Sequence, residues 1–259
     1  KIFEEQKELT QGTVVNVAVS LYIHYTKTGN KKAENALKLI YDFFDNIRNE
    51  KCETWGKIAI LHCFVNLKKA GLIDNINEDY ISLAKEKTDY SDFFLKDQMK
   101  LKPQYATNYV EVAMSCAGFR EFLGWEDEGY CSKICEMFVD MLKSKSQLGW
   151  MDEEVGIGRY DRYSFIVSAD MSDNFHLMGR ETPEFILQCL KRSANEVLFM
   201  ANRLGDGINY GRSLSFYGDT ANAKILATAL ANGLLKEEDY DKAVGYCINI
   251  IKKVLDFIN

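Results

Sequence analysis

Two segments of the chain combine tyrosine, arginine and glycine in a way that suits recognition of a polar ligand. They are Arg159–Tyr163 (Arg-Tyr-Asp-Arg-Tyr) and Gly207–Ser213 (Gly-Ile-Asn-Tyr-Gly-Arg-Ser). Six of the eight arginines lie between Arg159 and Arg212, whereas only one of the 24 lysines does. A guanidinium group can donate two parallel hydrogen bonds to a carboxylate, which a lysine cannot do. This part of the sequence therefore predicts a site for a polar, acidic ligand.

One chemistry that these residue types permit is β-elimination on a uronic acid. Tyr163 or Tyr160 would act as the acid and base, and Asp161 would orient it. Arg212 or Arg162 would neutralise the substrate carboxylate, because the neighbouring proton becomes removable only when that charge is offset. The structural alternative is that Asp161 caps the following helix while the tyrosines pack the loop.

Further polar and aromatic residues extend this candidate site. Asn108, at the start of a predicted helix, and Asn209 and Tyr210, in the second glycine-rich segment, are expected to bind substrate, since glycines let the backbone approach a ligand closely. Trp150 offers an indole face on which a sugar ring could stack. The alternatives are a helix cap for Asn108 and ordinary packing for Trp150.

Two other functions fit the same region. Residues 152–154 (Asp-Glu-Glu) and Asp161 could supply the two carboxyl groups of a glycoside hydrolase, or form a solvated loop. A non-catalytic helical-repeat protein that binds a glycan or a protein is the third hypothesis. Trp55, near another connection, has the same two interpretations as Trp150. No cofactor motif and no metal-ligand spacing is present, so we expect neither a cofactor nor a metal.

Composition limits the partners. The chain has 259 residues and a formal net charge of −6, which argues against a nucleic-acid or anionic-membrane binder. No apolar run approaches the roughly 20 residues of a membrane span. Seven cysteines, mostly inside apolar helical segments, indicate buried reduced thiols and a cytoplasmic protein. The sequence begins at Lys1, which we interpret as a trimmed N-terminus, and it does not define an oligomeric state.

The apolar periodicity is helical almost throughout and predicts an all-α fold. Ten helices are expected, over residues 4–28, 31–49, 54–71, 77–96, 107–124, 128–145, 164–179, 183–204, 218–232 and 237–258. Thr182 is expected to cap the helix that starts at Pro183. The segments 70–80 and 232–240 echo each other, which suggests repeated helical hairpins.

Repeated hairpins of this length predict an α/α toroid, in which inner and outer helices alternate. A ring of six hairpins needs twelve helices, so ten helices indicate an open or incomplete ring; an α-solenoid is the competing architecture. We expect one domain over residues 1–259, which either forms an open ring by itself or belongs to a longer protein. The connections 97–106, 146–163 and 205–217 would then emerge at one end and carry the site.

Between Tyr105 and about Thr228 the chain resembles a bacterial family known as domain of unknown function 2264. The resemblance rests on four segments taken in order: Thr107–Val110, Leu148–Asp152, Arg159–Ser164 and Gly207–Leu214. That family is similar in fold to the α/α-toroid polysaccharide lyases and unsaturated-glucuronyl hydrolases. The resemblance therefore implies a toroid and carbohydrate-related chemistry, with a polysaccharide lyase as the leading expectation.

Overall fold

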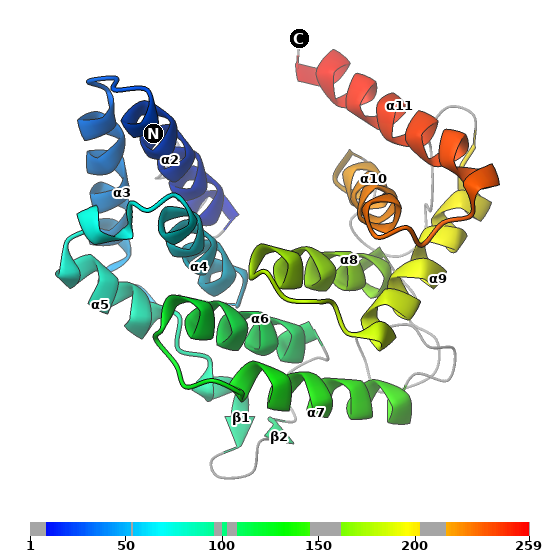
Figure 1. Ribbon diagram of the computed structural model, residues 1–259, viewed down its shortest axis with the longest axis horizontal. Helices are drawn as coiled ribbons and strands as arrows, with labels where there is room; N and C mark the ends of the chain where they lie inside the picture. Colours follow the sequence, from blue (N-terminus) through cyan, green and yellow to red (C-terminus); the bar gives the residue numbers. More distant parts are fainter. Residues whose placement is uncertain are drawn as a thin grey trace. The chain divides into compact units, whose positions relative to one another are not determined.

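A computed structural model of the chain describes residues 9–52, 54–95, 100–102, 108–145, 162–202 and 216–258 (Figure 1). These residues fold into ten α-helices and one pair of two-residue strands, which confirms the all-α class. The helices are α2 (Leu9–Lys27), α3 (Ala33–Ile47), α4 (Thr54–Lys69), α5 (Glu78–Lys87), α6 (Asn108–Leu123), α7 (Tyr130–Lys145), α8 (Arg162–Leu177), α9 (Glu184–Met200), α10 (Phe216–Ala231) and α11 (Tyr240–Ile258). Strands β1 (Phe94–Leu95) and β2 (Lys100–Leu101) pair antiparallel. No described helix combines the length and the apolar character that a bilayer crossing needs.

The fourth predicted helix is too long at its C-terminal end. It was expected over 77–96, but α5 ends at Lys87. The buried hydroxyl of Thr88 donates to the carbonyl oxygen of Ala84 at 2.7 Å, and the Arg120 guanidinium donates to the carbonyl oxygen of Lys85 at 2.8 Å. These side chains satisfy the last carbonyl groups of the helix, so the backbone is free to leave it.

The expected cap of α9 is also wrong. Pro183 occupies the N-cap position, where no side-chain hydrogen bond forms, and the helix begins at Glu184. The hydroxyl oxygen of Thr182 instead lies 3.2 Å from that of Ser172 on α8. The helix start is correct to one residue, but the threonine joins two helices rather than capping one.

The first helix of every hairpin ends in the same way. A glycine with positive φ, between 63° and 78°, follows α2, α4, α6, α8 and α10. The next backbone N–H donates to the carbonyl oxygen five residues earlier, as in Asn30 to Tyr25, Leu72 to Leu67, Trp125 to Arg120, Arg180 to Phe175 and Leu234 to Ala229, at 2.8–3.0 Å. This is the Schellman cap, which needs a left-handed residue and therefore favours glycine. The sequence similarity between residues 70–80 and 232–240 is thus part of a turn that is repeated five times.

The chain divides into two compact units. Unit 1 comprises residues 1–105 and 112–134, and unit 2 comprises residues 106–111 and 135–259. In unit 1 the ring of Phe44 packs edge-on against Phe64, which contacts Trp125 in turn. The single α/α-toroid domain expected over 1–259 remains a prediction.

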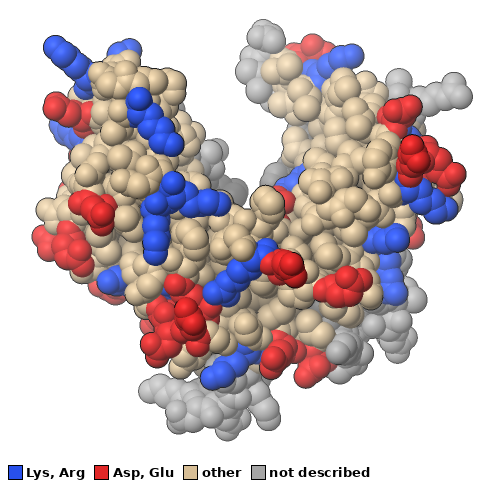
Figure 2. All heavy atoms as spheres, in the orientation of Figure 1, with Lys and Arg blue, Asp and Glu red and all other residues tan. Residues whose placement is uncertain are grey.

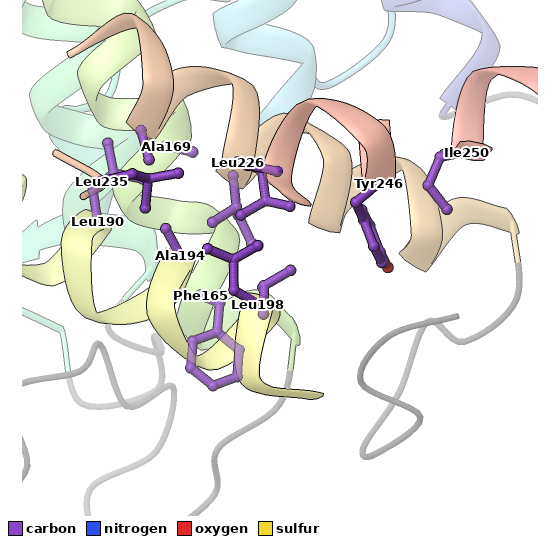
Figure 3. Close-up of a cluster of buried hydrophobic side chains, with 13 residues drawn as sticks. Phe165, Ala169, Leu190, Ala194, Leu198, Leu226, Leu235, Tyr246 and Ile250 are labelled. Carbon is purple, nitrogen blue, oxygen red and sulfur yellow. The ribbon is translucent and has the colours of Figure 1, made fainter. Parts of the chain in front are cut away.

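The core of unit 2 forms where α8, α9, α10 and α11 pack together (Figure 3). Phe165, Leu190, Leu226, Tyr246 and Ile250 are buried there. Small residues, such as Ala169 and Ala194, let the helices approach closely, and dense packing of this kind supplies most of the stability of a helical domain.

The seven cysteines are all free. Five are buried and two are half-buried. Burial raises the pKa of Cys116 to about 12 and the pKa of Cys189 to about 11. Both are therefore protonated, unreactive thiols at neutral pH, as the sequence predicted for reduced core cysteines.

Gly12 sets the distance between α2 and α4. A Cβ atom added there would lie 2.5 Å from the Cβ of Ala59, which no real contact allows. Gly245 on α11 offers the opposite environment, because an added Cβ would meet nothing within 4 Å.

We predict that Gly12→Ala destabilises the protein by roughly 1–3 kcal/mol, because α2 must move away from α4. Gly245→Ala is the matched control and should stabilise by up to about 1 kcal/mol, since alanine restricts the unfolded chain and favours helix. Chemical denaturation monitored by circular dichroism measures both. Equal effects of the two substitutions would contradict a close contact between α2 and α4.

Candidate functional site

The residues predicted to form the ligand site lie largely outside the described part of the chain. Asn108 begins α6, and Arg162 and Tyr163 begin α8, but their side chains are outside the description. The remaining candidates are outside it altogether: Trp150, Asp152, Glu153, Glu154, Tyr160, Asp161, Asn209, Tyr210 and Arg212. Whether these side chains share one cavity stays a prediction.

A different set of ionisable residues comes together in unit 2. We call Glu111, Asp170, Asp173 and Lys224 the carboxylate–lysine cluster. Glu111 lies in the first turn of α6, the two aspartates lie on α8, and the lysine lies on α10.

Helix geometry explains how α8 and α10 present these groups to each other. Asp170 and Asp173 are three residues apart, and Lys224 and Thr228 are four apart, so each pair occupies one face of its helix. The Lys224 ammonium forms an ion pair with the Asp170 carboxylate and a second one with Asp173 at 3.3 Å. The Thr228 hydroxyl donates to the other oxygen of Asp173 at 3.1 Å. A seam of polar contacts thus joins the two helices.

The side chains of this seam reach solvent to different extents. The exposed fraction is 23% for Asp170, 39% for Lys224 and 48% for Asp173. Exposed ion pairs contribute little to stability, so the seam has a modest role in holding the fold. Its charged atoms are accessible to a ligand.

Glu111 is the unusual member of the cluster. It is fully buried, and neither of its carboxyl oxygens has a hydrogen-bond partner among the described residues. A carboxylate in such a place would lose its hydration without replacement, which costs several kcal/mol. Protonation removes most of that cost.

The pKa shifts of Glu111, Asp170 and Lys224 have identifiable physical causes. Burial raises the pKa of Glu111 well above its ordinary value, and the negative charge of Asp170 raises it further, while Lys224 opposes the rise. The pKa of Asp170 is also raised on balance: burial and the charge of Asp173 raise it, whereas the charge and hydrogen bond of Lys224 lower it. Burial lowers the pKa of Lys224, yet the two aspartates outweigh it and the net shift is upward. Because Asp170 is ion-paired with Lys224 and Glu111 has no hydrogen-bond partner among the described residues, we assign the proton to Glu111 and the charges to Asp170 and Lys224.

The cluster pairs a carboxyl group that holds a proton with a carboxylate that does not. Pairs of acids whose surroundings give them opposite protonation states can act as general acid and general base. A structural role is the alternative, since ion-pair networks also shift pKa values.

On the face shown in Figure 2 the described basic and acidic side chains are interspersed.

The sequence analysis did not identify any of these four residues as part of a site. The resemblance used Thr107–Val110 and stopped one residue before Glu111. The available signals were the spacing of Asp170 and Asp173 and a single lysine, Lys224, in the alanine-rich stretch 221–231. Neither signal indicates a site unless the packing of α8 against α10 is known.

Comparison of the chain with known protein families, curated proteins and solved structures finds no match.

The buried carboxyl of Glu111 makes stability depend on pH in a definite direction. Its folded-state pKa is raised, so above its ordinary pKa of about 4.5 the folded protein binds a proton that the unfolded chain has released. The free energy of unfolding therefore falls with rising pH until the folded-state pKa is passed. Glu111→Gln cannot ionise, so its stability relative to the native protein should rise across that window.

Urea denaturation at several values between about pH 4 and about pH 8 measures this difference. Glu181→Gln, an exposed substitution in the same unit, is the control and should change stability little at any pH. A difference between Glu111→Gln and the native protein that does not vary with pH would show that Glu111 is ionised in the folded state.

Proposed function

We propose that this chain is a carbohydrate-directed enzyme of the glycoside hydrolase class, with the carboxylate–lysine cluster as its reacting groups. The observation that carries the proposal is the fully buried carboxyl group of Glu111, without a hydrogen-bond partner among the described residues, in one cluster with the lysine-paired Asp170. Glycoside hydrolysis needs one carboxyl group to protonate the leaving oxygen and a second to activate water or attack the sugar. The sequence alone suggested paired carboxylates, but in the segment 152–161 rather than in these helices.

Each residue has a distinct role in this proposal. Asp170 reaches solvent and acts as the base or nucleophile, while Lys224 keeps it charged. Glu111 supplies the proton to the glycosidic oxygen, and substrate binding must uncover its carboxyl group for that step. Asp173 holds the other side of the Lys224 ammonium, which fixes the position of the charge.

The toroid remains our proposal for the architecture that gathers these groups. Five hairpins closed by one repeated cap support it, as does the contact of α2 with α4 and of α8 with α10, since each pair joins the first helices of successive hairpins. This alternation suits an inner layer and an outer layer of helices.

A polysaccharide lyase is the second candidate, and the position of Tyr163 favours it. Tyr163 and Asp170 lie seven residues, or two turns, apart on α8, so both positions occupy the same face of that helix about 10 Å apart along the axis. Asn108 and Glu111 are similarly one turn apart on α6. We therefore propose that one ligand could span Tyr163 and the carboxylate–lysine cluster.

Assay of acidic and neutral polysaccharides with two readouts separates the candidates. A hydrolase releases reducing ends without a new chromophore, and Asp170→Asn should lower kcat by roughly 100-fold to 10,000-fold. A lyase forms an unsaturated product that absorbs in the near ultraviolet, and Tyr163→Phe should abolish it.

The folded state of each variant is checked by circular dichroism, and Glu181→Gln serves as the active control. Full activity of Asp170→Asn would exclude the hydrolase mechanism. Failure of every polysaccharide to react would exclude both enzymes and favour the binding module.

A further inference from the structure

Unit 1 contains a pocket that the proposed chemistry does not use. It is open, has a volume of about 660 Å³ and lies between α2 and α4. Ten residues line it: Gly12, Asn16, Val17, Ser20, Leu21, Trp55, Gly56, Ile58, Ala59 and His62. A volume of this size is typical of sites for small organic ligands.

The floor of the pocket is fixed by a close helix contact. The absence of a side chain at Gly12 lets α2 approach Ala59 of α4. The side-chain amide nitrogen of Asn16 donates to the carbonyl oxygen of Gly12 at 2.8 Å and to that of Ala59 at 3.2 Å. This bridge joins the two helices and locks the orientation of the asparagine, so the pocket is preformed.

The bridge also determines what Asn16 offers to a ligand. Both of these hydrogen bonds use the amide nitrogen, which leaves the side-chain carbonyl oxygen as an acceptor. Ser20, one turn further along α2, donates its hydroxyl proton to the backbone oxygen of Asn16 and keeps its own oxygen as an acceptor. Two acceptors one helical turn apart suit a ligand that carries several hydroxyl groups.

Apart from Asn16, Ser20 and His62 the lining is apolar, and none of its residues is acidic, lysine or arginine. Trp55 leaves 41% of its surface exposed, and Val17 leaves 54%. A large indole kept in contact with water provides a flat surface for a ring that is apolar on its faces and polar at its edge. A charged ligand would find no permanently charged side chain in this lining, which therefore favours a neutral ligand.

We propose that this pocket binds a neutral sugar ring, stacked on Trp55 with its hydroxyl groups directed to Asn16 and Ser20. The identity of the ligand as a sugar rests on the proposed carbohydrate function, whereas its neutral, ring-shaped character rests on the pocket itself. Unit 1 would then hold a glycan residue at a position where no reaction occurs.

Calorimetric titration with neutral tetrasaccharides of glucose, mannose and xylose tests the proposal. We expect binding by at least one of them, and a loss of affinity of about fivefold or more in Trp55→Ala. Tyr130→Ala is the matched control, because Tyr130 is a similarly exposed aromatic residue of unit 1, at 38%, that does not line the pocket. It should bind as the native protein does. Trp55→Phe should recover part of the affinity, since it restores an aromatic face.

Three results would overturn the proposal: no binding of any neutral sugar, equal affinity of Trp55→Ala and the native protein, or binding of only a neutral apolar dye such as N-phenyl-1-naphthylamine. Asp170→Asn, titrated in parallel, keeps the two hypotheses apart. Sugar binding that survives in this variant and depends on Trp55 supports the pocket even if no polysaccharide is cleaved. Cleavage that depends on Asp170, without any effect of Trp55 on binding, supports only the enzyme.

Discussion

The fold depends on one local constraint, the left-handed glycine that ends the first helix of every hairpin. The backbone hydrogen bond that spans five residues closes the last turn and sends the chain into the next helix. Without that turn a helix has unpaired carbonyl groups at its end and no defined exit direction. The repetition of this cap makes α8 and α10 the first members of successive hairpins, and these two helices carry the aspartates and the lysine of the site.

Much of this arrangement follows from the sequence. Ten helices were expected and ten are described, because the periodic burial of apolar residues and the glycines at hairpin turns are local signals. The error at the end of α5 has a non-local cause: the carbonyl groups there are satisfied by Arg120, which lies 32 residues after Thr88. The cap of α9 fails in the same way, because Thr182 contacts a residue on another helix.

The site was harder to predict than the helices. The two segments with tyrosine and arginine stand out because glycine is a poor helix former, whereas Asp170 or Lys224 on a helix resembles any solvated residue. Their meaning arises only when α8 and α10 pack with these side chains facing each other. Glu111 is harder still, since a glutamate in the first turn of a helix ordinarily favours the helix dipole and faces water. Its complete burial is a property of the tertiary structure.

The complete burial of Glu111 raises the question of why a carboxyl group occupies this position. An apolar residue at position 111 would fill the same space without the cost of burying a carboxyl group, so stability alone does not account for Glu111. Burial raises the pKa of Glu111 and so favours its neutral form, and the Asp170 carboxylate of the same cluster is ion-paired with Lys224. A proton donor and a proton acceptor in one place are the requirement of acid–base catalysis. Under the proposed hydrolase mechanism, the energetic cost at Glu111 would be the cost of keeping a proton donor in the carboxylate–lysine cluster.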